Sequence, residues 1–199
     1  MITFDNNIIT LVYGNSATGK TTLCLQTALE FAKQNKVLFI DSENGFSVER
    51  LKQMDKDYKI YLKNIIVIKV RNFEEQNKIF GNINQMIKEL NIKIIIFDTI
   101  GMHYRLALQN ENYADVNEKL LLQLKELKHF SENFNIPILI TNQVYTNMEG
   151  KNIGVGGNML ARFGKRLIEL KKNPRKAVFM KPEEKTVNFE LTDEGLKII

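Results

Sequence analysis

The chain has 199 residues, 44% of them hydrophobic and 26% charged, which is typical of a globular domain large enough to bury a full core. No apolar run is long enough to span a membrane, the N-terminus lacks a signal-peptide pattern, and the single cysteine, Cys24, excludes an intramolecular disulfide. With a net charge of +5, these features predict one cytoplasmic domain over residues 1–199 and exclude a membrane protein or a disulfide-stabilised secreted protein.

The first predicted elements are a strand over residues 8–13 and a helix that begins near Lys20. Between them the sequence reads G-x-x-x-x-G-K-T, the pattern of a phosphate-binding loop, or P-loop. Glycines allow a tight turn around an anion, and the backbone N–H groups then face the phosphates. We expect nucleotide contacts from Gly14, Asn15, Ser16, Ala17, Thr18, Gly19, Lys20 and Thr21, with the Thr21 hydroxyl also a ligand of Mg²⁺.

Apolar strands and helical patterns alternate between residues 8 and 141. The helical patterns are centred on residues 79–90 and 116–127. Such alternation predicts an α/β fold with a mostly parallel, twisted sheet covered by helices on both faces. The predicted strands cover residues 8–13, 37–41, 65–70, 93–98 and 137–141.

Polar residues follow three of these strands. Asp98 ends the strand over residues 93–98, where P-loop proteins hold Mg²⁺. Glu43 follows another strand and suits a base that activates water, although an acid at the N-terminus of the next helix is the alternative. Gln143 follows the third and suits a sensor of the γ-phosphate, with a turn residue as the alternative.

Two segments interrupt the regular pattern, and both leave the carboxyl ends of strands, where α/β proteins bind ligands. Residues 101–112 are polar, and residues 144–157 are rich in glycine and asparagine. Beyond them, closely spaced segments over residues 160–170, 177–180 and 186–191, separated by Asn173-Pro174 and Pro182-Glu183, predict C-terminal antiparallel strands that extend the sheet.

Residues 151–185 carry ten Lys and Arg against three Glu, an excess of +7. A basic segment of this kind indicates an anionic partner, first of all nucleic acid, and the alternative is a solvated lysine-rich surface. We expect little sequence preference, because such contacts go to phosphates. Tyr145, Phe163 and Phe179 offer faces for base stacking, although core packing is the alternative for the two phenylalanines. The expected DNA contacts are Arg105, Lys151, Arg162, Lys165, Arg166, Lys171, Lys172, Arg175 and Lys176.

The order and spacing of these motifs resemble the ATPase core of the RecA/RadA recombinase family. The residues concerned are Gly14–Thr22, Asp41–Glu43, Ile96–Asp98, Tyr104-Arg105, Ile140–Val144 and Gly156–Asn158. The resemblance implies ATP and Mg²⁺ as ligands, with Lys20, Thr21 and Thr22 at the phosphates. It implies Glu43, Lys20 and Gln143 as catalytic residues, Thr21 and Asp98 at the metal, and Arg50 stacked on adenine. Residues 101–112 and 144–157 would be the two loops that touch DNA.

The chain also departs from that family. It resembles a core without the N-terminal helical DNA-binding domain of RadA. Glu111 lies near the place of a basic DNA contact, and Arg162 stands where recombinases have a histidine. The second loop is shorter, and the acidic cap over the neighbouring subunit's ATP is reduced to Lys181-Pro182.

These departures favour a weak ATPase that assists recombination and repair without itself exchanging strands. The expected partners are single-stranded or branched DNA, the RadA recombinase, a junction nuclease and further copies of the chain. A KaiC-like signalling ATPase and a non-catalytic, DNA-bound mediator are the alternatives.

Overall fold

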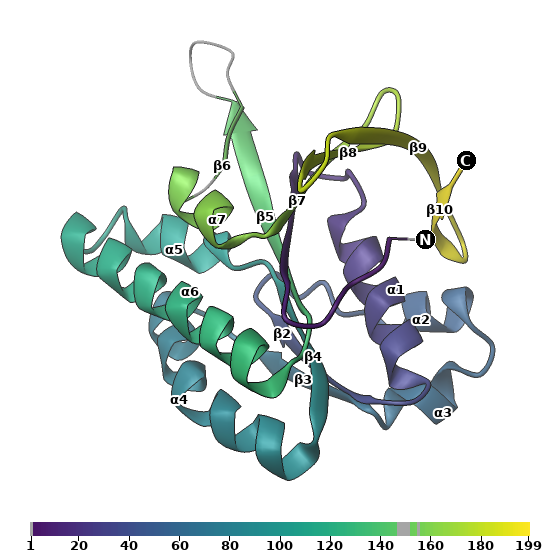
Figure 1. The fold of residues 1–199 in the computed structure, drawn as a ribbon, viewed down its shortest axis with the longest axis horizontal. Coiled ribbons are helices and arrows are strands. Elements are labelled where there is room, and N and C mark those ends of the chain that lie inside the picture. The colour runs from purple at the N-terminus through teal and green to yellow at the C-terminus, as the bar shows by residue number, and fades with distance from the viewer. Residues whose placement is uncertain (1, 147–151, 155) are drawn as a thin grey trace.

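The strands are β1 (Ile9–Gly14), β2 (Lys36–Asp41), β3 (Ile65–Lys69), β4 (Ile92–Asp98), β5 (Ile138–Thr146), β6 (Asn152–Gly154), β7 (Arg166–Lys171), β8 (Lys176–Lys181), β9 (Lys185–Thr192) and β10 (Gly195–Ile198). In the computed structural model, which describes residues 2–146, 152–154 and 156–199, they form a ten-stranded sheet in the order β10-β9-β8-β7-β1-β5-β4-β2-β3, with β6 paired to β5 (Figure 1). The six strands from β7 to β3 in this order run parallel, and β8, β9 and β10 continue the sheet in antiparallel fashion.

The helices are α1 (Lys20–Ala32), α2 (Val48–Met54), α3 (Tyr58–Leu62), α4 (Phe73–Leu90), α5 (Gly101–Ala107), α6 (Tyr113–Phe134) and α7 (Gly157–Phe163). Helices α1 to α3 cover one face of the sheet and α4 to α6 cover the other (Figure 1). Each face therefore has its own apolar core, and the central strands are apolar on both sides because both of their faces are buried. The predicted fold class is confirmed.

The region after Gly156 differs from the prediction of a strand over residues 160–170. Residues 157–163 form α7, which begins after Gly156 in a left-handed conformation (φ 79°) and ends at Gly164. Leu160 is buried in the core beneath α6, and Phe163 packs against the same core from the last position of the helix. The apolar residues of this segment thus follow a helical spacing, and β7 begins only at Arg166, where it pairs with β1 in parallel.

The two segments predicted as irregular also differ from expectation. Residues 101–107 form α5, which buries His103 and Tyr104 against the core. In the second segment, β5 continues to Thr146 and pairs with β6 in antiparallel fashion, so a two-stranded ribbon projects beyond the sheet (Figure 1). We call β5 residues 144–146 and β6 the β5–β6 ribbon. Lys151 lies outside the described residues.

Among the residues that the structure describes, no helix combines the length and apolarity needed to cross a bilayer.

Candidate nucleotide-binding site

The P-loop joins β1 to α1, the strand–loop–helix context that the sequence predicted. Gly19 precedes the helix with φ 106° and Ala17 also has a positive φ, so the loop makes the sharp turns that point its amides inward. The Lys20 ammonium is buried and donates to the carbonyls of Gly14 (2.8 Å) and Asn15 (2.9 Å). The lysine therefore already lies across the mouth of the loop, where terminal phosphates bind in P-loop proteins.

The C-terminal strands close around this loop, which the sequence did not predict. A Cβ atom on Gly14 would lie 2.3 Å from the Leu170 carbonyl of β7, so no other residue fits there. The Arg175 guanidinium, from the turn between β7 and β8, donates to the Ala17 carbonyl (3.3 Å). On the other side, the Leu191 side chain of β9 lies over Gly19.

Strand register brings the predicted site residues to one edge of the sheet. Asp41 of β2 is paired with Asp98 of β4, and Gly14 of β1 is paired with Gln143 of β5. Because all four strands run parallel, their carboxyl ends open on the same side, above which the P-loop turns. The structure thus brings together the acids, the amide and the lysine named from sequence.

Asp98 has the surroundings of a metal ligand. Its carboxylate is buried, Thr141 Oγ1 donates to Oδ1, and Oδ2 has no hydrogen-bond partner among the described residues. Burial raises the pKa of this carboxyl, and the nearby hydroxyls of Thr141 and Thr21 oppose that effect. The orphaned oxygen and the Thr21 hydroxyl are the hard oxygen donors that Mg²⁺ prefers, so these residues fit the metal.

Glu43 lies in a turn that hydrogen bonds to the Asp41 side chain hold in place. The Asp41 carboxylate accepts hydrogen bonds from the backbone N–H groups of Glu43 (3.3 Å), Gly45 (3.0 Å) and Phe46 (3.1 Å). Gln143 Nε2 then donates to Glu43 Oε1 (2.7 Å). The N-cap of α2 is Ser47, so the alternative of Glu43 as a helix-capping acid does not apply.

Lys20, Glu43 and Asp98 influence one another electrostatically. Burial lowers the pKa of the Lys20 ammonium, and the charges of Asp98 and Glu43 oppose this. Burial also raises the pKa of the half-buried Glu43 carboxyl, and the charge of Asp98 raises it further, whereas Lys20 and the Gln143 hydrogen bond lower it. A carboxylate with a raised pKa is a better proton acceptor, which suits a general base.

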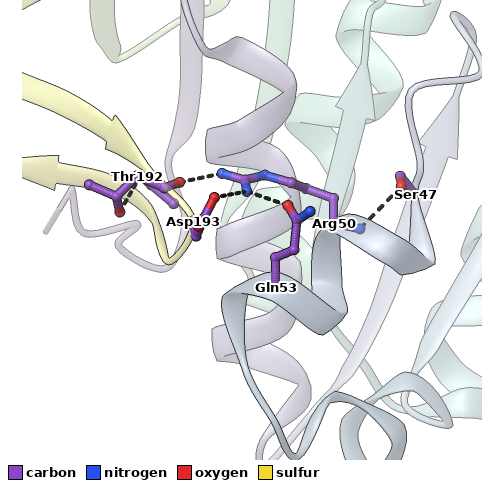
Figure 2. Close-up of polar contacts among 6 residues, drawn as sticks. Ser47, Arg50, Gln53, Thr192 and Asp193 are labelled. Atoms are coloured by element: carbon purple, nitrogen blue, oxygen red, sulfur yellow. Dashed lines mark hydrogen bonds and ion pairs between the residues drawn. The ribbon is translucent and has the colours of Figure 1, made fainter.

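Arg50, which we expect at the adenine, lies on α2. Its guanidinium contacts Gln53 of the same helix and the turn between β9 and β10 (Figure 2). That turn directly follows Leu191, the residue over Gly19, so Arg50 is placed beside the P-loop.

The basic residues of the C-terminal third form two groups and not one patch. Lys165 and Arg166 lie at the amino end of β7, and Arg166 is paired with Asp5 and with the Thr3 carbonyl. The second group is at the opposite end of β7, roughly 16 Å away for a strand of this length, next to the P-loop. It comprises Lys171, Lys172, Arg175 and Lys176, which we call the β7–β8 cations.

Two further predicted DNA contacts lie on helices, and the predicted stacking residues Phe163 and Phe179 pack against the core. Arg105 is exposed on α5, and Arg162 is exposed on α7 beside the same hollow as Lys165. Phe179 is a partly buried residue of β8 that packs against the core.

Asp41, Ser42 and Thr141 belong to the sequence motifs named above, but the sequence predicted no role for them. Ser42 Oγ donates to the Thr99 carbonyl (2.6 Å) and accepts from the Thr99 N–H (2.7 Å). Ser42 directly follows β2 and Thr141 lies within β5, and both strands pair with β4, so a position beside the strand that carries Asp98 was the available signal.

Known proteins with similar sequences are recombination proteins. A profile of the Rad51 family matches residues 2–197. Proteins named DNA repair and recombination protein RadB from Methanocaldococcus jannaschii, Thermococcus sibiricus and Methanococcus maripaludis are 34%, 33% and 35% identical to this chain. Each alignment covers 98% of this chain, and 95%, 88% and 93% of the respective relatives. The similarity therefore includes the P-loop, the strand ends and the C-terminal strands.

Proposed function

This chain belongs to the Rad51 family, where its relatives are archaeal RadB proteins, and we propose from this that it is an ATP-dependent accessory factor of homologous recombination and DNA repair. RecA and Rad51 proteins are ATPases that act on DNA and use ATP with Mg²⁺. The observation that carries the proposal is the hydrogen bond between Gln143 and Glu43 at the strand edge that also carries Lys20 and Asp98.

In this proposal the P-loop residues 14–19 bind the phosphates through their amides, and Lys20, Thr21 and Thr22 complete the phosphate contacts. Thr21 and Asp98 hold Mg²⁺, which neutralises phosphate charge when bound. Glu43 accepts a proton from the attacking water, and Gln143 positions Glu43 and responds to the γ-phosphate.

Hydrolysis by the isolated chain is slow in this proposal. Lys20 and Arg175 are the cations in contact with the described P-loop residues, and both donate to its carbonyls. A transition-state cation supplied by another subunit is worth roughly 10³–10⁵ in rate to P-loop enzymes, so a chain acting alone lacks that factor. ATP then serves mainly to set the conformation of the chain.

DNA binds in this proposal at the β7–β8 cations, beside the P-loop and on the same side of the sheet as the β5–β6 ribbon. Contacts to phosphates suit single-stranded or branched DNA of any sequence. We propose that the chain assists the RadA recombinase and a junction nuclease and does not exchange strands itself.

The test measures ATP binding, ATP hydrolysis and DNA affinity for the purified chain and for Lys20→Ala. We expect the natural chain to bind ATP with Mg²⁺, to hydrolyse it slowly, and to change its DNA affinity with ATP. Lys20→Ala should lose ATP binding and this change in DNA affinity. Absence of ATP binding by the natural chain contradicts the proposal, and repair activity retained by Lys20→Ala in cells indicates a non-catalytic mediator.

A further inference from the structure

Arg50 is held by three acceptors along the edge of its guanidinium. Nη2 donates to the Thr192 carbonyl (2.5 Å), Nη1 donates to Gln53 Oε1 (2.7 Å), and Nη1 lies 3.8 Å from Asp193 Oδ1 (Figure 2). A guanidinium is planar and donates from its edge, so bonds of this kind fix the plane and leave its faces available for stacking.

Two of these acceptors belong to the turn between β9 and β10, which is also attached to the P-loop helix. Gln26 of α1 exchanges hydrogen bonds with the backbone of Leu196, through its Nε2 (3.2 Å) and its Oε1 (3.0 Å). The β9–β10 hairpin thus contacts α1, which follows the P-loop, through Leu196. It contacts Arg50 of α2 through Thr192 and Asp193.

Packing does little to fix Asp193 and Glu194 of this turn. A hollow of about 390 Å³ lies between the turn, α1 and α2, lined among others by Gln26, Met54, Thr192 and Glu194. The Asp193 side chain is 94% exposed. The hollow leaves Asp193 and Glu194 exposed, so the bonds to Arg50 help to fix this end of the turn, while the buried Gly195 and Leu196 contact Gln26 at the other end.

We infer that the β9–β10 turn is part of the nucleotide site, and that Asp193 and Gln53 are positioning residues that orient Arg50 toward the purine base. The inference rests on the proposed function, since it assumes that a nucleoside triphosphate occupies the P-loop. Leu191 lies over Gly19 at the start of α1, and Arg50 is bonded to the next residue, so a base beside the loop meets the guanidinium face. Stacking of a cation on an aromatic ring stabilises the bound base, and a disordered guanidinium loses part of that stabilisation.

The test compares two ligands that share the phosphates and differ in the base: ATP and inorganic tripolyphosphate, each with Mg²⁺, by titration calorimetry. The double variant Gln53→Ala/Asp193→Ala removes both side-chain acceptors and keeps Arg50. We expect its affinity for ATP to fall by about three- to tenfold, with its affinity for tripolyphosphate unchanged. Arg50→Ala should show the same selective loss.

Matched controls separate positioning from general damage. Glu184→Gln neutralises an exposed carboxylate between β8 and β9, away from the β9–β10 turn, and should change neither affinity. Gln53→Glu keeps an acceptor for Arg50 and should retain ATP affinity in the Asp193→Ala background, where Gln53→Ala loses it. Equal loss of both ligands in the double variant, or no loss of either, overturns the inference while leaving ATP binding by the natural chain intact. Failure of the natural chain to bind ATP overturns both this inference and the proposed function.

Discussion

Asp98 is held in a position that favours ligand binding over stability of the free chain. Its carboxylate is buried with Oδ2 unpaired among the described residues, and Asp41 and Glu43 add two more acids near one lysine, Lys20. Because the pKa of Asp98 is raised above its unfolded value, the ionised form destabilises the folded chain at neutral pH. That destabilisation is relieved as the pH falls through the raised pKa.

Asp98→Asn should therefore stabilise the nucleotide-free chain and abolish its Mg²⁺-dependent ATP binding. We expect the melting temperature at pH 7 to rise by about 2–4 °C, the shift that about 1 kcal/mol produces in a chain of this size. Thermal unfolding with and without Mg²⁺ and ATP measures both effects. Glu126→Gln, which neutralises an exposed acid on α6, is the control and should change neither. A lower melting temperature for Asp98→Asn would contradict the assignment of a destabilising charge.

Glu43 should determine the acidic limb of the pH–rate profile. Its pKa is raised by burial, so loss of activity on acidification begins at a higher pH than for an ordinary glutamate, because the base must be ionised. The hydrogen bond from Gln143 lowers this pKa, so Gln143→Leu should move the limb to still higher pH. Single-turnover hydrolysis measured between about pH 5 and pH 8 tests this expectation. The exposed Gln109→Leu is the matched control, and an acidic limb that Gln143→Leu leaves in place would argue against Glu43 as the base.

At the scale of elements, β7 separates the two groups of basic residues and determines which of them accompanies the nucleotide. Lys165 and Arg166 lie at its amino end, and Arg166 is neutralised by Asp5. Lys172 and Lys176 lie beyond its carboxyl end, beside the P-loop. In the proposed function, the second group is therefore the one through which bound DNA would affect the nucleotide.

Lys172→Glu/Lys176→Glu should weaken DNA binding equally for unrelated sequences. Each lost phosphate contact should reduce the slope of log affinity against log salt by about 1. Lys52→Glu/Lys59→Glu makes the same change of charge on α2 and α3 and is the matched control. Fluorescence anisotropy with single-stranded DNA over a salt series gives both quantities. Equal effects of the two double variants would mean that net charge, and not these positions, governs binding.

At the scale of the whole molecule, the C-terminal strands complete the second core and the nucleotide site together. Phe189 of β9 is one of the largest fully buried side chains, and it packs in the core that also contains α1. In Figure 1, β8, β9 and β10 curve over α1. The helix that follows the P-loop is thus enclosed by the last elements of the chain.

Phe189→Ala should destabilise the chain by about 3–5 kcal/mol, the usual cost of removing a buried phenylalanine. ATP affinity should fall as well, because β9 leads into the turn that holds Arg50. Urea unfolding measures the first effect and calorimetry the second. Met180→Ala on β8 is the control, since that side chain is 44% exposed. A loss below 1 kcal/mol for Phe189→Ala would show that β9 is peripheral.

The parallel sheet and the P-loop were predictable because their signals are local. Buried parallel strands are continuous apolar runs, and G-x-x-x-x-G-K-T needs only a strand before it and a helix after it. Asp98, Glu43 and Gln143 followed from the rule that the carboxyl ends of parallel strands meet at one edge. Each of these arguments uses residues close together in the sequence.

The features that were missed depend on pairing between distant segments. Residues 160–170 mix apolar and charged residues with no clear period, and the division into α7 and β7 follows the packing of Leu160 beneath α6 and the end of the helix at Gly164. The basic residues of the C-terminal third were predicted as one patch, because the sequence does not show that β7 separates Lys165 and Arg166 from the β7–β8 cations. The contacts of Arg50 with Thr192 and Asp193 join residues more than 140 positions apart, and no local pattern reports them.

The contact of Gly14 with the Leu170 carbonyl has a mechanical consequence. There is no room for even a methyl group between the P-loop and β7, so neither segment can shift along the sheet without displacing the other. β7 is joined through Gly164 to α7, and α7 follows the β5–β6 ribbon. A displacement of α7 that moves β7 along the sheet should therefore also move the P-loop.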